Sequence, residues 1–338
     1  MFTSPRIFAL AATLAAGTAL AVPLPVHAAT GSGNGEEIHM SYPDYDSDLF
    51  ISEIYRQMVA ELGYSMAKPI VLSGPTPYPA VAQGDTDFFV NAWFPLNSKP
   101  YETVKDDAVV VGEVAHKGAI QGFMVDKKSA EKYHIKTLDD FKRPEVAKAF
   151  DRNGDGKPDM VGCQLGWSCE AKVNDLLTDL KLKSTFNLIK AKYVAAFAEM
   201  EAAYQAGEPI LYYAWTPNWT SNELVAGKDV EWVSVPQRKG VDLPAAEKND
   251  ACTTNPCRFG FAANTISAVA NRKFIAKHPD IRKLLEEANV PVADINKQNA
   301  EMHAGDRNVK KQAAEWIKAN RSEVDTWLSA ARAARKTN

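Results

Sequence analysis

Three tryptophans stand where elements of secondary structure are expected to end: Trp93 in NAWFPLN, Trp167 in GCQLGWSCEA and Trp215 in LYYAWTPNW. A tryptophan inside a helix stripe or a strand usually packs in the core, whereas tryptophans at the ends of elements are typical of pocket walls. The face of a tryptophan ring is the best side-chain surface for a cation that donates no hydrogen bond, such as a quaternary ammonium group. These residues therefore predict a pocket for an onium ligand.

The segment around Trp167 also predicts an anion site. Ser168 and Cys169 follow the tryptophan and lead directly into an expected helix at Glu170. Free backbone N–H groups at a helix start attract an anion without any charged side chain. The Ser168 hydroxyl is equally suited to cap the helix. An aromatic wall beside an anion site suits a zwitterion that carries a bulky cation and a carboxylate.

No catalytic constellation accompanies these residues. The sequence contains no G-x-S-x-G, no H-E-x-x-H and no phosphate-loop motif. Its six histidines are scattered, and none has an obvious nucleophile or metal-ligand neighbour in the sequence. We therefore expect a binding protein rather than an enzyme, with no cofactor and no metal.

One segment, DRNGDGKPD at residues 151–159, matches the front of a calcium loop. Oxygen-bearing side chains and a glycine stand at the required spacing, but Gly162 occupies the place of the closing glutamate. Asn-Gly and Asp-Gly pairs are also strong turn formers. We favour a polar turn that starts at Asp151 and ends at Asp159, with calcium binding as the alternative.

The N-terminus predicts export. Residues 1–28 combine Arg6, the apolar run IFALAATLAAGTALAV and small residues near the expected cleavage point. The apolar run is too short to favour a spanning helix. We expect a cleaved signal peptide and a periplasmic mature protein.

The formal net charge of −3 becomes about −4 without Arg6, and no Lys/Arg-rich block exists. Nucleic acid and anionic membrane surfaces are therefore not expected as partners.

The four cysteines form two close pairs, Cys163/Cys169 and Cys252/Cys257. After export, close pairs favour disulfides, which here would hold the shape of short loops. The alternative, a zinc site, would require all four cysteines to meet with tighter spacing.

Strand-like and helix-like segments alternate at residues 38–42, 48–64, 68–73, 79–85 and 87–94. This alternation predicts a parallel α/β sheet, in which ligands bind beyond the carboxyl ends of the strands. Trp93 lies at such an end. Tyr42, Tyr45 and three aspartates follow the first strand in YPDYDSD, where we favour a helix cap by Asp46 or Ser47.

The later part of the chain predicts a second domain. Residues 109–126 read as a pair of strand-like runs that lead into it, and Thr137 is placed to cap a helix. Tyr212 and Tyr213 alternate on a strand, so at most one of them faces a cleft. Four further tryptophans are expected to pack, two of them in amphipathic C-terminal helices: Trp219, Trp232, Trp316 and Trp327.

Four segments, taken together, resemble the periplasmic glycine betaine/proline betaine-binding proteins of osmoprotectant ABC transporters. They are VNAWFPLNSKPYE, FDRNGDGKPDMVGCQLGWSCEAKVND, PILYYAWTPNWTSNEL and VPVADINKQNAEMH, in the family's order. The resemblance implies an α/β fold of the two-lobed, type II-like periplasmic substrate-binding class, with a hinge about which the lobes close on the ligand. It places the first lobe at residues 29–120 and 260–338 and the second lobe at residues 121–259.

The resemblance also assigns roles. It implies that Trp93, Trp167 and Trp215 form a box around a trimethylammonium group, and that the N–H groups of Ser168 and Cys169 meet a carboxylate. Two positions depart from the family pattern: Ser168 replaces the usual glycine, and Asn97 replaces a histidine that contacts the carboxylate. An asparagine amide can donate a hydrogen bond but never becomes cationic. The preferred betaine, sulfonium analogue or methylated amine therefore stays open, with choline less favoured because it would leave the anion site unused.

These inferences combine into one expectation. The protein is a monomeric periplasmic receptor that captures glycine betaine or a related quaternary-ammonium zwitterion and delivers it to the membrane permease of an ABC transporter. The first alternative is an exported enzyme that acts on a quaternary-ammonium substrate in the same cleft. The second is a structural or adhesive envelope protein, for which the three tryptophans would be indifferent to small solutes.

Overall fold

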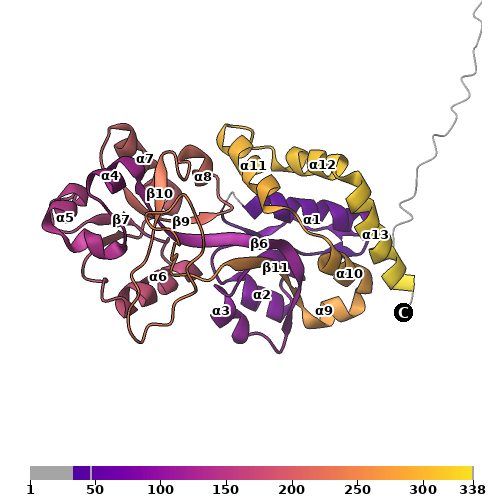
Figure 1. The fold of residues 1–338 in the computed structure, drawn as a ribbon. Coiled ribbons are helices and arrows are strands. Elements are labelled where there is room, and N and C mark those ends of the chain that lie inside the picture. Colours follow the sequence, from indigo (N-terminus) through magenta and orange to yellow (C-terminus); the bar gives the residue numbers. More distant parts are fainter. Residues whose placement is uncertain (1–32, 46–47, 337–338) are drawn as a thin grey trace, which may run out of the picture.

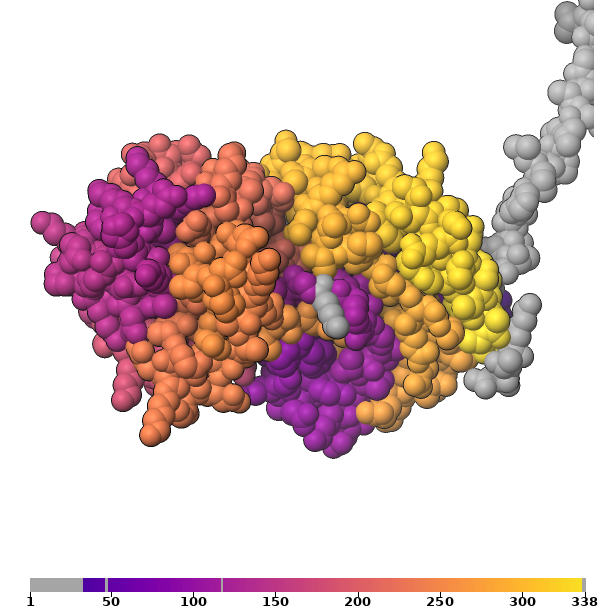
Figure 2. Space-filling view, viewed as in Figure 1, coloured from indigo at the N-terminus to yellow at the C-terminus, as the bar shows by residue number. Residues whose placement is uncertain are grey.

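The structure, a computed structural model, describes residues 33–45 and 48–336. The expected signal peptide, residues 1–28, lies outside this part of the chain. Two groups of helices and strands stand on either side of a long central strand, β6 (Ala108–Asp126), as Figure 1 shows. In Figure 2 the indigo and yellow ends of the chain form one side of the molecule, which we call the first lobe. The magenta and orange middle of the chain forms the other side, the second lobe.

The first lobe is built around helix α1 (Leu49–Glu61), whose buried face carries Ile51, Ile54 and Met58. Gly63 ends this helical segment with a φ of 93°, a left-handed conformation that glycine adopts without steric cost. The other elements before β6 are β1 (Glu37–Ile38), β2 (Ser41–Pro43), β3 (Ser65–Met66), β4 (Ile70–Leu72), α2 (Pro77–Gln83), β5 (Phe88–Phe94) and α3 (Ser98–Glu102).

Five helices from the C-terminal part of the chain complete this lobe (Figure 1). They are α9 (Arg272–Lys277), α10 (Pro279–Glu287), α11 (Val292–His303), α12 (Val309–Ala319) and α13 (Arg321–Lys336). Trp316 of α12 packs edge-on against Phe50 of α1, and Trp327 of α13 is buried. The expected packing role of both tryptophans is confirmed.

One large mixed sheet joins the two lobes. β11 (Asn264–Asn271) lies between β5 and the first part of β6 and runs antiparallel to both. From Ile120 onward β6 pairs with β9 (Leu211–Thr216), and its last four residues also pair with β10 (Val230–Val233). β7 (Asp159–Val161) and β8 (Asn187–Ile189) extend the sheet beyond β9 in parallel. The expected lobe limits, residues 29–120, 121–259 and 260–338, stay predictions.

The helices of the second lobe surround its part of the sheet. They are α4 (Lys127–Lys132), the 3₁₀ helix η2 (Leu138–Lys142), α5 (Pro144–Phe150), α6 (Ser168–Asp179), α7 (Tyr193–Gln205) and α8 (Thr220–Glu223). The cap predicted at Thr137 is confirmed: its hydroxyl accepts from the Asp139 N–H, and Asp140 completes a capping box. Trp219 stacks on His303, and Trp232 packs edge-on against Phe259, so both pack as expected.

Two expectations from the sequence were wrong. Residues 109–126 form one strand rather than two, because Gly112 and Gly118 adopt positive φ values of 67° and 103° that bend the strand without ending it. A Cβ at Gly112 would collide with the Leu285 carbonyl oxygen, so this close backbone approach requires glycine. The sheet is mixed rather than parallel. Parallel pairing occurs between β2 and β4, but β5 pairs with β11, which arrives from far along the chain.

Within the described part of the chain, no helix has both the length and the apolar character to cross a membrane.

Candidate functional site

A cavity lies between the lobes and is lined by residues from both of them. Its volume is about 840 Å³ when the space open to solvent is included. All six residues predicted to contact a ligand line this cavity: Trp93, Asn97, Trp167, Ser168, Cys169 and Trp215. The fold therefore brings together side chains from three distant segments of the chain.

Two tryptophans of the second lobe form an angled wall. Trp167 occupies the residue before α6, and Trp215 stands near the end of β9. Their ring centroids lie 5.8 Å apart with an interplanar angle of 81°. Trp93, near the end of β5, lines the cavity from the first lobe, and its indole N–H donates to Asn91 Oδ1 over 2.8 Å. Both lobes therefore contribute an aromatic surface to the same space.

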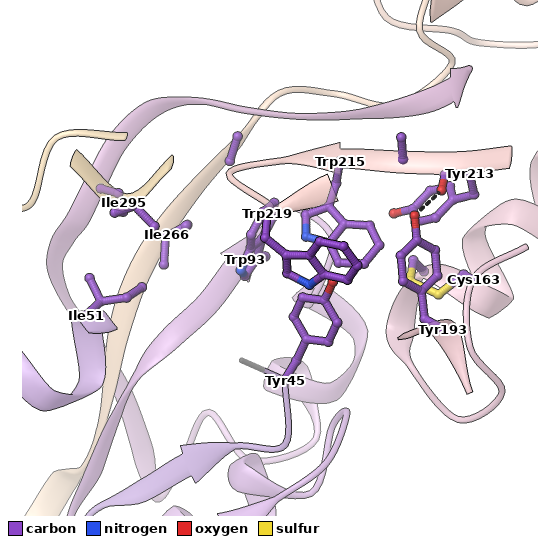
Figure 3. Close-up of a cluster of buried hydrophobic side chains, with 14 of the residues drawn as sticks. Tyr45, Ile51, Trp93, Cys163, Tyr193, Tyr213, Trp215, Trp219, Ile266 and Ile295 are labelled. Carbon is purple, nitrogen blue, oxygen red and sulfur yellow. Dashed lines mark hydrogen bonds between the residues drawn. A yellow bond between two sulfur atoms is a disulfide. The ribbon is translucent and has the colours of Figure 1, made fainter. Parts of the chain in front are cut away.

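Tyr45 is a fourth aromatic residue of the site. Its ring lies 5.3 Å from each of Trp167 and Trp215, and its hydroxyl donates to Asn218 Oδ1 over 3.0 Å. Figure 3 shows Tyr45 reaching Trp215 from the loop that follows β2. Sequence reasoning missed this role because YPDYDSD also fits a helix cap. The residue before α1 is Asp48, whose carboxylate makes no capping bond, and Asp46 and Ser47 lie outside the described residues.

A second layer of aromatic rings supports Trp215 (Figure 3). The Tyr193 ring lies 4.6 Å from the Trp215 ring, and the Tyr193 hydroxyl donates to the Tyr213 carbonyl oxygen over 2.8 Å. The Tyr213 hydroxyl donates to Gln121 Oε1. Burial raises the pKa of both tyrosine hydroxyls, so they keep the protons that they donate. Tyr213 lines the cavity and its neighbour Tyr212 does not, as expected for alternating strand residues.

The anion end of the site is the start of α6. Ser168 is the first residue of this helix, so it does not act as the helix cap that the sequence also allowed. The first N–H groups of a helix have no acceptor within the helix, and Ser168 and Cys169 both line the cavity.

The predicted disulfide between Cys163 and Cys169 is present and ties the preceding loop to the helix start. The second predicted disulfide, Cys252–Cys257, is also present.

Asn97 links the two lobes beside this helix start. Its Nδ2 donates to Ser168 Oγ over 2.8 Å, and its Oδ1 accepts from the Trp93 backbone N–H over 2.8 Å. The two positions that depart from the family pattern are therefore hydrogen-bonded to each other. A direct contact between Asn97 and the ligand stays a prediction, but the Asn97 amide already has two protein partners.

We expect the hydrogen-bonded side chains of Asn97 and Ser168 to contribute jointly to ligand binding. Asn97→Ala and Ser168→Ala should each weaken ligand binding by about fivefold, because a hydrogen bond across the cleft contributes about 1 kcal/mol to the closed form. The double variant should be little worse than either single variant, with a coupling energy of about 0.5–1.5 kcal/mol. Isothermal titration calorimetry on the four proteins measures this cycle, and additive losses would show that the bond does not support closure.

The polar segment at residues 151–159 forms the turn that we favoured, between α5 and β7. The Asp151 carboxylate accepts hydrogen bonds from the backbone N–H groups of Gly154, Asp155 and Gly156. Among the residues that the structure describes, no group of three or more His, Cys, Asp or Glu side chains is arranged to hold a metal ion. The absence of a metal stays a prediction.

Comparison with known proteins gives consistent matches. Residues 36–319 match the family model of the substrate-binding domain of ABC-type glycine betaine transport systems. The chain is 37% identical over 336 residues to the glycine betaine/proline betaine-binding periplasmic protein of Salmonella typhimurium, with 98% of each chain covered. It is 35% identical over 338 residues to the glycine betaine-binding periplasmic protein OusX of Dickeya dadantii, covering 98% of this chain and 99% of that one.

Solved structures share the fold. Lactococcal OpuAC in its closed-liganded conformation with glycine betaine matches with a TM-score of 0.68 at 18% identity, covering 87% of this chain and 99% of that one. An ABC-transporter choline-binding protein in complex with choline matches with a TM-score of 0.68 at 18% identity, covering 89% and 97%. At this identity the likeness establishes the α/β substrate-binding-protein fold alone.

Proposed function

The chain belongs to the family of substrate-binding domains of ABC-type glycine betaine transport systems, and from that premise we propose that it captures glycine betaine or a close relative between its lobes. It is a binding protein and not an enzyme, as its family is. Its relatives are periplasmic, and the periplasm is where this receptor works.

The observation that carries the proposal is the shared cavity of Trp93, Trp167 and Trp215 beside the start of α6. Micromolar capture requires about 8 kcal/mol of binding free energy. A desolvated cation–π contact contributes up to about 2 kcal/mol, so three rings supply much of this amount. The carboxylate of the betaine accepts hydrogen bonds from the N–H groups of Ser168 and Cys169, which stabilise its negative charge without a cationic side chain.

The mixed origin of the site explains how binding is coupled to closure. Trp93 belongs to the first lobe, and Trp167 and Trp215 belong to the second, so the aromatic box is complete only when the lobes are close together. Domain closure around a ligand is a common way to trap a small solute. In our proposal the closed monomer then docks on the membrane permease of its ABC transporter.

A calorimetric titration with a ligand panel tests the proposal. The panel contains glycine betaine, proline betaine, a sulfonium analogue, choline and proline. We expect binding of the betaines and no binding of proline, which has no methylated onium group for the box. If none of the methylated onium compounds produced heat, the proposed function would be wrong.

A further inference from the structure

The cavity continues past the tryptophans along strand β5. Phe89, Asn91 and Trp93 all line the cavity, and a bulge in the pairing of β5 with β11 interrupts the regular alternation of side chains between Phe89 and Ala92. Glycine betaine has a single methylene carbon between its onium nitrogen and its carboxylate. The tryptophans would bind the onium group of glycine betaine, and the start of α6 would bind its carboxylate. The part of the cavity lined by Asn91 and Phe89 would then contact no charged group of this ligand.

Three buried polar atoms without hydrogen-bond partners gather over this stretch. They are Ser41 Oγ, Asp48 Oδ1 and Tyr78 Oη, unpartnered within the described residues, and each of the three residues lines the cavity. The exposed fractions of these residues are 1%, 7% and 2%. We call this group the polar subsite.

The fold explains why the three residues meet. The Met40–Phe88 bridge sets β2 beside β5, which brings Ser41 next to Phe89. The Tyr78 ring packs edge-on against Phe89 with centroids 5.1 Å apart. Asp48 reaches the same strand through its other oxygen, which accepts from Asn91 Nδ2 over 2.9 Å.

Asn91 separates the polar subsite from the aromatic box. Its Oδ1 accepts from the Trp93 indole, and its Nδ2 donates to Asp48, so both ends of the amide are engaged. Asn91 therefore holds Trp93 and Asp48 at fixed positions.

Native proteins rarely leave buried polar atoms without partners, and three in one ligand cavity indicate that the ligand supplies what is missing. An ionised carboxylate accepts hydrogen bonds and cannot donate one, so Asp48 requires a donor. Burial raises the pKa of the Asp48 carboxyl to about 7, with the Asn91 hydrogen bond opposing the rise and the Asp44 charge adding to it. A ligand hydroxyl or amine would give Asp48 the partner that the chain does not.

We propose that Ser41, Asp48 and Tyr78 form a second subsite that binds a hydrogen-bond-donating substituent of the ligand. The inference rests on the proposed function, because the onium group must occupy the aromatic box. The ligand class is then a betaine that carries a hydroxyl or amine in addition to its trimethylammonium group and carboxylate. Glycine betaine fills only part of the cavity.

Two matched ligand pairs test the polar subsite: carnitine with γ-butyrobetaine, and serine betaine with alanine betaine. The members of each pair carry the same charges and differ by one hydroxyl, so their affinity ratio isolates the hydroxyl. For the wild-type protein, calorimetry should show a preference of about tenfold for the hydroxylated member of at least one pair.

Variants then assign the preference to residues. In Asp48→Asn the new amide oxygen takes over the bond from Asn91, and its N–H group faces the cavity, so the preference for a donor should vanish or invert. Tyr78→Phe should reduce the ratio as well. Thr86→Val is the matched control, since Thr86 Oγ1 is also buried and unpartnered within the described residues but does not line the cavity. This control should keep the wild-type ratio.

The outcomes separate the two proposals. Equal affinities within both pairs, or binding of glycine betaine without binding of either pair, would overturn the polar subsite and leave the proposed function standing. An unchanged ratio in Asp48→Asn would also overturn the polar subsite. If no onium compound bound at all, the proposed function would fail and the polar subsite with it.

Discussion

Trp167→Ala should weaken the binding of glycine betaine by about 30-fold and leave the protein folded. The loss of one desolvated cation–π contact costs about 2 kcal/mol, and each 1.4 kcal/mol changes the affinity tenfold. Trp167 is only half-buried and stands at the residue before α6, so its removal opens little core. Trp215 is a poorer choice because it is buried against Tyr193 and Tyr213, and its loss would also cost about 3–5 kcal/mol of stability.

Trp316→Ala is the matched control for this experiment. Trp316 is also half-buried, packs edge-on against Phe50 and donates to Asp294 over 2.9 Å, all away from the cavity. We expect the control to lower the melting temperature and to keep the dissociation constant. Calorimetric titration and thermal melts on both variants separate affinity from stability. Near wild-type affinity in Trp167→Ala would remove this residue from the aromatic box.

The sequence predicted the aromatic wall because tryptophans at the ends of elements have few other roles. The close cysteine pairs likewise predicted both disulfides, since short spacing limits their possible partners. The sequence predicts two strands where the structure has only β6. A glycine looks the same in a sequence whether it bends a strand, as Gly112 and Gly118 do here, or ends it. The antiparallel pairing of β5 with β11 could not be predicted either. The hydrophobic periodicity of a segment indicates whether it forms a strand, but not which distant strand it pairs with.

The polar subsite could not be predicted from the sequence, because its residues come together only through tertiary contacts. Ser41 and Tyr78 are ordinary residues of a short strand and a short helix, and only the placement of β2 and α2 against β5 brings them together. Asp48 belongs to the segment YPDYDSD, in which the sequence favours a helix cap by Asp46 or Ser47 and gives Asp48 no separate role. What distinguishes it is the lack of a capping bond and the unpartnered oxygen, which only the structure reveals.

Asp48→Asn should stabilise the ligand-free protein at neutral and alkaline pH. The Asp48 pKa is about 7 in the folded protein, against an ordinary value of 3.8. Between these values the folded protein holds the proton more tightly than the unfolded chain, so wild-type stability falls as the pH rises from about 4 to about 7. The gap of roughly 3 pKa units corresponds to at most about 4 kcal/mol. Asparagine does not ionise and escapes this loss.

Urea denaturation of both proteins between pH 4.5 and 8.5 measures the effect. The free energy of unfolding of the variant minus that of the wild type should grow as the pH rises and level off above about pH 8. Glu199→Gln is the control, because it removes an exposed carboxylate on α7 that does not line the cavity, and it should change stability by less than about 0.5 kcal/mol. A difference for Asp48→Asn that did not depend on pH would mean that the carboxylate is not strained in the ligand-free protein.

A hydroxylated betaine should reduce the stability advantage of Asp48→Asn over the wild-type protein. The Asp48 carboxylate lowers the stability of the ligand-free protein because burial removes it from water and the described chain gives one of its oxygens no donor. A hydroxylated betaine would provide that donor. A ligand stabilises the folded state by RT ln(1 + [L]/Kd), so tighter binding to the wild type adds to its stability alone. At saturating carnitine and pH 8, the advantage of Asp48→Asn should therefore shrink, whereas γ-butyrobetaine, which has no hydroxyl, should leave more of it. Stability is given up at this position because the unpartnered oxygen is what allows the cavity to select its ligand.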